Sequence, residues 1–128
     1  MEIRGVDFVS ICVPEDKMEE AKQFYGQLLG LRQEGISNDT WVEYQAGALT
    51  IGLDSAPLLA PAADAAPGGE VRIALAVSDV AKAMAELEQK GVRAALPAED
   101  FGPCLQAALR DPFGNLIFLH QRRDGTAG

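Results

Sequence analysis

The stretch that decides the fold runs R-D-P-F-G-N-L-I-F-L-H-Q, from Arg110 to Gln121. Residues 111–115 have the composition of a turn, because proline presets φ, glycine accepts positive φ and Asx side chains bond nearby backbone. Apolar runs with β character flank this turn at 105–109 and 116–119, so the stretch predicts a β-hairpin. Alternation along its second strand predicts one face with Leu116, Phe118 and His120 and another with Ile117 and Leu119.

Length and charge limit the class of protein. The chain has 128 residues, enough for one domain, and 48% of them are hydrophobic, enough for a substantial core. Its net charge of −8 argues against a nucleic-acid or anionic-membrane partner. Solubility alone explains this negative charge, although the charge is also compatible with a cationic partner.

The lack of a targeting pattern and the spacing of the two cysteines predict a soluble cytoplasmic protein. The sequence has no apolar run of transmembrane length and no signal-peptide pattern. Its two cysteines, Cys12 and Cys104, have no CxxC spacing, so they imply neither a disulfide nor a zinc site.

The first half of the chain predicts a strand, a helix and three strands. The strand covers 6–13, where apolar residues alternate, and the helix opens at Pro14 and stops at Gly30. Its apolar positions recur at helical spacing: Met18, Ala21, Phe24, Tyr25, Leu28 and Leu29. Three short strands are predicted around 31–34, 41–44 and 48–53, and an Ala/Pro/Gly-rich surface linker follows them.

The second half predicts the same elements again. A strand at 71–77 precedes a helix that Ser78 or Asp79 caps and Gly91 ends. A strand at 92–96 and the hairpin follow, and residues 122–128 are expected to fray. Equivalent positions of the two copies are separated by a constant number of residues: the separation is the same for Val13 and Val77 as for Phe8 and Arg72. A second separation is shared by Gly47 and Gly114 and by Ile51 and Phe118. A sheet from one copy cannot bury its apolar face alone, so we expect the two copies to pair.

Two motifs carry a family resemblance. F-Y-G-Q-L-L-G-L at 24–31 and D-P-F-G-N-L-I-F-L at 111–119, with the strand-to-helix junctions, resemble the vicinal oxygen chelate superfamily. This superfamily contains the glyoxalase, bleomycin-resistance and extradiol-dioxygenase-like proteins. The resemblance covers nearly the whole chain and implies an α+β fold of two βαβββ modules, whose curved mixed sheet surrounds a cleft. It implies a single domain over 1–128, with module 1 at about 1–54, a linker at 55–69 and module 2 at about 70–121.

The resemblance also implies where a metal would lie. Enzymes of the superfamily usually hold a divalent metal with His, Gln or Glu on the first and fourth strands of each module. Carried over residue by residue, the equivalent positions are Phe8, Ile51, Arg72 and Phe118. None of these side chains is a usable metal ligand, because phenylalanine and isoleucine have no lone pair and arginine stays cationic. We therefore expect no metal, no cofactor and no catalytic residue of the usual kind.

No other set of residues in the sequence is predicted to form an active site. His120 is the one histidine, and a catalytic metal normally needs about three protein ligands. Ser10 and Cys12 lie on the expected cleft face of the first strand, but only His120 could serve them as a base. Small residues that leave room for a ligand explain this pair more simply, and Cys104 is explained as a small apolar residue at a strand start.

The remaining prediction for the functional site is a binding cleft. Its expected residues are Phe8, Trp41, Ile51, Arg72, Phe118 and His120, with Leu53 as a further candidate. Phe8, Ile51 and Phe118 either contact a ligand or close a filled core. The guanidinium of Arg72 needs an acid such as Glu43 or Glu70, or a ligand, because an unpaired buried charge is costly.

Three functions are compatible with this sequence. The first is a metal-free protein resembling the bleomycin-resistance branch, which sequesters a drug or metabolite in an apolar cleft and acts as a homodimer in antibiotic resistance. The second is a lyase, isomerase or dioxygenase-like enzyme with an atypical active site. The third is a structural or regulatory protein whose cleft is filled by its own side chains.

Overall fold

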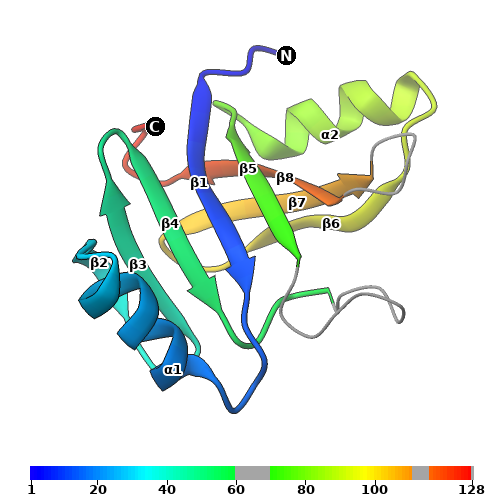
Figure 1. The fold of residues 1–128 in the computed structure, drawn as a ribbon. Coiled ribbons are helices and arrows are strands. Elements are labelled where there is room, and N and C mark those ends of the chain that lie inside the picture. The colour runs from blue at the N-terminus through cyan, green and yellow to red at the C-terminus, as the bar shows by residue number, and fades with distance from the viewer. Residues whose placement is uncertain (60–69, 111–115, 128) are drawn as a thin grey trace. The chain divides into compact units, whose positions relative to one another are not determined.

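The computed structural model describes residues 1–59, 70–110 and 116–127. The elements, in chain order, are β1 (Gly5–Cys12), α1 (Met18–Lys22), η1 (Gln23–Leu28), β2 (Arg32–Ser37), β3 (Trp41–Ala46), β4 (Leu49–Asp54), β5 (Val71–Ala76), α2 (Val80–Gln89), β6 (Ala94–Asp100), β7 (Cys104–Arg110) and β8 (Leu116–Arg122) (Figure 1). This order confirms the predicted repeat of strand, helix and three strands in an α+β fold. The predicted turn at 111–115 and linker residues 60–69 lie outside the described residues.

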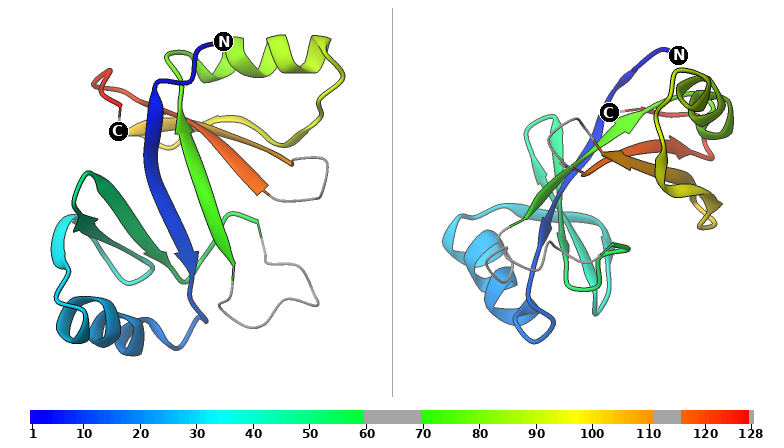
Figure 2. Two further views of the ribbon diagram at one scale, coloured as in Figure 1. Left: turned by 45° about the horizontal axis from the view of Figure 1, so that its top comes forward. Right: turned by 90° about the vertical axis from the view of Figure 1, so that its right-hand side faces the viewer.

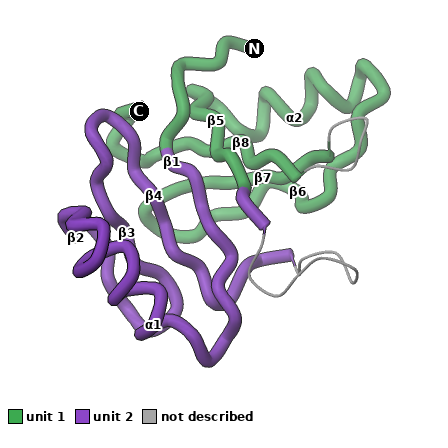
Figure 3. Tube along the Cα trace, in the orientation of Figure 1, with its two compact units in different colours: residues 1–7, 72–128 green, residues 8–71 purple. Residues whose placement is uncertain are grey.

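The chain divides into two compact units, which are described separately (Figure 3). Unit 1 contains residues 1–7 and 72–128, and unit 2 contains residues 8–71. The boundary falls inside β1, so the first residues of this strand group with the second half of the chain.

Unit 2 is a four-stranded sheet with α1 and η1. Its strands are ordered β2-β3-β4-β1, where β1 and β4 run parallel and the remaining pairs antiparallel. The core lies between the sheet and α1, where Met18 packs with Val42, Tyr44 and Leu53. Alternation in β3 and β4 therefore gives one face to this core and the other to Trp41 and its neighbours.

The first helix is shorter and more irregular than the sequence predicts. It begins at Met18 rather than at Pro14, and it widens into the π-helical η1, where the Leu29 N–H donates to the Phe24 carbonyl at 2.9 Å. Gly26 lies in this turn under the Tyr44 ring, because a Cβ at position 26 would come within 3.1 Å of the Tyr44 hydroxyl. The close approach of the ring accounts for a glycine inside the helical segment.

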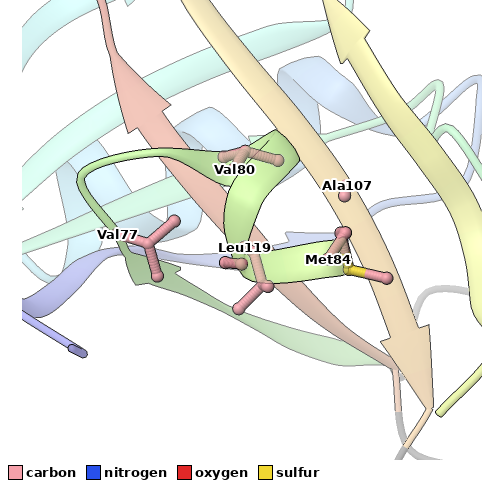
Figure 4. Close-up of a cluster of buried hydrophobic side chains, with 6 residues drawn as sticks. Val77, Val80, Met84, Ala107 and Leu119 are labelled. Carbon is pink, nitrogen blue, oxygen red and sulfur yellow. The ribbon is translucent and has the colours of Figure 1, made fainter. Parts of the chain in front are cut away.

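Unit 1 repeats the architecture with the strand order β5-β8-β7-β6. Its β5 and β8 run parallel, and its β8, β7 and β6 run antiparallel. Helix α2 lies over β6, β7 and β8 (Figure 2). The core of the unit lies beneath this helix and contains Val77, Val80, Ala83, Met84, Ala107 and Leu119 (Figure 4).

Both ends of α2 follow the sequence prediction. The Asp79 side chain accepts a hydrogen bond from the Lys82 N–H at 3.0 Å, which satisfies one of the open donors of the first turn. The Gln121 side chain of β8 accepts another from the Val80 N–H at 3.0 Å. Gly91 follows the helix with φ of 88°, a conformation that glycine adopts without strain.

The predicted fraying of residues 122–128 is wrong for the described part of this segment. Strand β8 extends to Arg122, and Arg123 pairs with Asp100. The Gly125 carbonyl accepts a hydrogen bond from Arg4 Nη2 at 3.1 Å. Polar side chains thus hold a segment that its composition marks as loose. No helix within the described residues has the length and apolar character needed to cross a membrane.

Candidate functional site

The two faces of the unit 1 sheet differ in chemistry. Leu105 and Leu119 pack on the α2 side. Alternation places Phe118 and His120 of β8 on the opposite side, as the sequence predicts, and the extension of the strand to Arg122 adds this residue to the same side. The register of β7 adds Cys104 opposite Arg122, Gln106 opposite His120 and Ala108 opposite Phe118. The name His120 face is used below for this side of unit 1.

A buried ion pair lies at the centre of the His120 face. His120 Nδ1 lies 2.6 Å from Asp7 Oδ2, and the two residues are 113 positions apart in the sequence. His120 is 7% exposed and Asp7 is 1% exposed. Arg122 Nη2 lies 3.7 Å from Asp7 Oδ1, so two cationic side chains of β8 approach one carboxylate of β1. This arrangement satisfies the rule that a buried charge needs a partner.

The pKa of His120 is set by competing effects. Burial lowers it, but the hydrogen bond with Asp7 and the interaction with Cys104 raise it more, and the resulting pKa is about 9. The ring is therefore an imidazolium at neutral pH, with its Nδ1–H donated to Asp7. Such a group can donate a proton to a bound molecule and can also stabilise a neighbouring anion.

Cys104 and Gln106 complete the polar part of this face. Cys104 is half-buried at the first position of β7, beside the exposed residues 101–103. Gln106 is 8% exposed and lies directly opposite His120. Its side chain therefore adds an amide to the His120 face. Sequence reasoning treated Cys104 as a small apolar residue and did not single out Asp7 or Gln106.

Three predicted site residues lie on the same face of unit 1. Arg72 is 2% exposed, Phe118 is 5% exposed, and His120 lies two residues beyond Phe118 on the same side of β8. Ala74 of β5 pairs with Phe118, so Arg72 follows two positions away on the same face. The register thus places an arginine, an aromatic ring and a histidine on one face of the unit 1 sheet.

Two other predicted site residues meet in unit 2. The rings of Phe8 and Trp41 touch edge to face, with centroids 5.2 Å apart. The Trp41 indole covers Gly52, where any Cβ would overlap the ring, and its Nε1–H donates to Glu43 Oε2 at 2.7 Å. Glu43, one of the expected partners of Arg72, is thus hydrogen-bonded to Trp41. The name Trp41 face is used for this side of unit 2.

The prediction that Ile51 and Leu53 lie on the same face as Phe8 is wrong. Ile51 pairs with Tyr44 and Leu53 pairs with Val42, and both partners belong to the core under α1. Directly paired residues share a face, so Ile51 and Leu53 point to the α1 side of the sheet. Gly52 is the residue of β4 that lies on the Trp41 face.

A divalent metal does not fit the family's usual ligand positions in this chain. On the Trp41 face, Phe8 occupies the ligand position of β1 and its ring contacts the Trp41 ring. Gly52, which lies under the Trp41 indole, occupies the ligand position of β4. On the His120 face the equivalent residues are Arg72 and Phe118, which offer no lone pair to a metal. Among residues 1–59, 70–110 and 116–127, no three His, Cys, Asp or Glu side chains are grouped to hold a metal ion.

A hollow of about 290 Å³ in unit 1 lies away from the His120 face. The first turns of α2 line it with Ser78, Asp79, Lys82 and Glu86, together with Met1. The Met1 amino group and Glu86 form an ion pair at 2.8 Å across this hollow. It is therefore a polar depression beside the helix, and it does not include the predicted ligand-binding residues.

Comparisons with known proteins agree with the fold. The model of the Glyoxalase/Bleomycin resistance protein/Dioxygenase superfamily matches residues 6–119. No curated protein matches the chain in sequence.

Several solved structures share the architecture. A hypothetical protein from Bacillus halodurans C-125 has 18% identity and a TM-score of 0.71, with 96% of this chain and 97% of that chain covered. Methylmalonyl-CoA epimerase from Mycobacterium tuberculosis has 19% identity and a TM-score of 0.66, with coverage of 94% and 89%. A glyoxalase/bleomycin resistance protein/dioxygenase superfamily member from Vibrio splendidus 12B01 has 16% identity and a TM-score of 0.63, with coverage of 94% and 99%. Identities this low establish the fold alone.

Proposed function

Because the chain belongs to the Glyoxalase/Bleomycin resistance protein/Dioxygenase superfamily, we propose that it binds a small organic molecule without a metal. The ligand is a drug or metabolite with an apolar body and one anionic or carbonyl oxygen. In this proposal the protein sequesters its ligand in the manner of the bleomycin-resistance proteins, and it contributes to antibiotic resistance.

One observation carries the proposal: Arg72 and Phe118 lie on the same side of neighbouring strands. The pairing of Ala74 with Phe118 fixes this arrangement. An arginine can donate two parallel hydrogen bonds to one carboxylate or to adjacent oxygen atoms, and an aromatic wall buries an apolar body. The Phe8–Trp41 pair supplies a second aromatic surface in unit 2.

The donor set supports binding without a metal. The four expected positions offer two phenylalanines, one arginine and the Ile51–Gly52 segment of β4, so no lone pair converges there. Elemental analysis of tag-free protein is expected to find no divalent metal at one per chain. About one zinc, nickel, iron or manganese per chain that is lost in His120→Asn would contradict the proposal.

Location and assembly belong to the same proposal. We place the protein in the cytoplasm as a homodimer, with no nucleic-acid or membrane partner. The net charge of −8 supports the absence of those two partners. Cys12 and Cys104 are both free thiols in the structure, as is usual in a reducing compartment.

A ligand screen tests the proposal. The melting temperature is measured with matched pairs of aromatic compounds, one member with a carboxylate and the other with a neutral group of similar size. We expect the carboxylate members to raise the melting temperature of the wild type, and Arg72→Gln to abolish that shift. Arg32→Gln removes an exposed arginine of β2 and serves as the control, because Arg32 pairs with Glu34 at the surface.

Two outcomes separate the alternatives. If no compound shifts the wild-type melting temperature and Phe118→Ala unfolds the protein, these residues form a filled core and the binding proposal fails. If Arg72→Gln does not fold, Arg72→Lys keeps the charge but loses the paired donors. A carboxylate shift of the same size in Arg72→Lys and the wild type would then count against recognition by the guanidinium.

The buried Asp7–His120 pair favours an enzyme as the second candidate. A buried titratable group with a shifted pKa is typical of acid–base catalysis, and the pKa of His120 is raised to about 9. Methylmalonyl-CoA epimerase is among the proteins with this fold. A screen of acyl thioesters and 2-oxo acids for deuterium exchange in D₂O, with His120→Asn beside the wild type, tests for a lyase or isomerase. No exchange above the uncatalysed rate would exclude this reaction for the compounds screened.

A further inference from the structure

The negative charge of this chain is concentrated in unit 2. Residues 8–71 contain ten acidic and three basic side chains, whereas the rest of the chain contains nine acidic and eight basic ones. Unit 2 therefore holds seven of the eight net negative charges. Its three cations form ion pairs at the surface: Lys17 with Glu20, Lys22 with Glu19 and Arg32 with Glu34. The potential of this unit attracts cationic molecules.

Glu43 places one of these negative charges beside an aromatic ring. Trp41 Nε1–H donates a hydrogen bond to Glu43 Oε2 at 2.7 Å. Oε1 lies close to Gly35 of β2, where a Cβ would come within 2.5 Å of that oxygen. An indole N–H is a neutral donor, so it orients the carboxylate without neutralising its charge. Gly35 is exposed and Glu43 is half-buried, so a molecule approaching from the side of β2 can reach the carboxylate.

The rings of the Trp41 face are held in place by their neighbours. The Trp41 indole covers Gly52, and its ring meets the Phe8 ring edge to face with centroids 5.2 Å apart. Phe8 and Trp41 are each half-buried, so both rings keep part of their surface accessible. The face of an aromatic ring attracts a cation that lies within about 6 Å of its centroid. The rings and the Glu43 carboxylate therefore favour the same kind of ligand.

We propose that the Trp41 face of unit 2 is a binding site for an organic ammonium cation. The ammonium N–H groups donate hydrogen bonds to Glu43, and the carbon substituents of the ligand pack against the rings of Trp41 and Phe8. The inference goes beyond the ligand proposed above, because it concerns unit 2 and uses neither Arg72 nor Phe118.

The chemistry of this face separates an organic ammonium from other ions. An anion is repelled by the Glu43 charge and by the negative faces of the rings. An inorganic cation lacks the carbon substituents that gain from burial against an aromatic surface. Asp54 pairs with Trp41 in the strand ladder and lies on the same side of the sheet, where its side chain accepts a hydrogen bond from the Ala56 N–H at 3.0 Å. A second carboxylate thus adds to the negative potential around the indole.

The first experiment uses Trp41 as its own reporter, because it is the one tryptophan of the chain. The fluorescence of the unmodified protein is followed during titration with benzylammonium and, in parallel, with benzyl alcohol, which is neutral and of similar size. Phosphate buffer at constant ionic strength avoids competing amines. We expect a saturable change with benzylammonium and an affinity at least about tenfold higher than that of benzyl alcohol. Equal affinities, or no response to benzylammonium, would overturn the proposal.

Glu43→Gln tests the role of the charge. The amide oxygen keeps an acceptor for Trp41 Nε1–H, so the variant removes the charge and retains the hydrogen bond. We expect benzylammonium to bind at least about tenfold more weakly and benzyl alcohol to bind as before. Glu34→Gln is the matched control, since it removes the same charge from an exposed pair on β2. An equal loss in both variants would assign the attraction to the net charge of the unit and overturn the site.

A labelled sample locates the ligand independently. The indole Nε1–H resonance of ¹⁵N-labelled protein should shift with benzylammonium, with the same midpoint as the fluorescence change. A resonance that does not move would contradict binding at Glu43 and Trp41. Circular dichroism shows which variants are folded, and the two titrations of the unmodified protein decide the question if Glu43→Gln does not fold.

The ring of Phe8 is tested in the same assay. Phe8→Leu keeps an apolar side chain but removes the ring, and we expect it to weaken benzylammonium binding by about threefold. An unchanged affinity in the folded variant would contradict the part assigned to Phe8. The carboxylate screen with Arg72→Gln uses other compounds and another residue, so failure of the binding proposal and failure of this site are distinguishable.

Discussion

His120 is the residue with the most informative environment in this chain. Burial disfavours its charged form, but Asp7 and Cys104 favour that form more strongly, so the pKa rises to about 9. An ordinary histidine titrates near 6.5 and would be mostly neutral under the same conditions. The direction of this shift makes the histidine contribute to stability in a defined pH range.

The stability of the protein is expected to fall as the pH rises from about 6.5 to about 9. In the folded protein the pKa of His120 is raised to about 9 from its ordinary value of 6.5, so the stabilisation by His120 is complete below pH 6.5 and is lost as the pH passes through 9. The shift corresponds to about 3 kcal/mol. Urea unfolding at pH 6, 7.5 and 9.5 measures the loss.

His120→Asn is the control for this pH dependence. The variant keeps a polar side chain but cannot titrate, so its unfolding free energy should change less over the same range. An equal slope in both proteins would assign the pH dependence to other groups.

Phe118→Ala is expected to lower the free energy of unfolding by roughly 3–5 kcal/mol, because deletion of a buried ring leaves a cavity. Phe118 is 5% exposed, and its partners Ala74 and Ala108 are too small to close the gap. Urea unfolding measures the change. Phe24→Ala is the matched control, since Phe24 is 47% exposed. Similar small losses in both variants would mean that Phe118 faces a solvated cavity.

At the scale of elements, the register of β4 determines which side chains face a site. Val9 pairs with Ile51 in unit 2, and Ile73 pairs with Ile117 in unit 1. The counterpart of Ile51 in the repeat is therefore Ile117, and the counterpart of Phe118 is Gly52. The offset taken from the sequence was wrong by one residue, and a slip of one residue moves every side chain of a strand to the other face.

Gly52→Ala is expected to destabilise the protein by about 1–3 kcal/mol, because the new methyl group overlaps a ring that cannot move without cost. A Cβ at position 52 would overlap the Trp41 indole, which is fixed by Phe8 and Glu43. Thermal or urea unfolding measures the loss.

A double variant shows whether the ring is the cause. Trp41→Leu removes the overlapping atoms, so Gly52→Ala should cost less in the Trp41→Leu background than in the wild type. The same cost in both backgrounds would attribute it to the backbone of β4 instead.

At the scale of the whole molecule, we expect the chain to form a homodimer. Sheets with open edges favour association with a second copy, and the exposed apolar residues of η1, Phe24 and Leu28, add surface that a partner could cover. Light scattering should give twice the chain mass of 13.6 kDa. A mass of one chain between micromolar and millimolar concentration would contradict this expectation, and Leu28→Glu tests whether η1 is involved.

The sequence by itself determined the two β-α-β-β-β repeats, a helix cap at Ser78 or Asp79, the Gly91 stop and the shared face of Phe118 and His120. These features depend on local periodicity and on backbone preferences, which neighbouring residues encode. It did not determine the π-helical turn of η1, because the approach of Tyr44 to Gly26 is a contact between distant segments.

Only the tertiary structure decided which polar groups meet. Asp7 and His120 are 113 positions apart, and Cys104 reaches the same face through the register of β7 with β8. In the sequence Asp7 is one acid among many, and Cys104 is a small residue at a strand start. Strand pairing brings them together because it is set by the packing of whole faces, and local pattern does not encode the partner of a strand across the sheet.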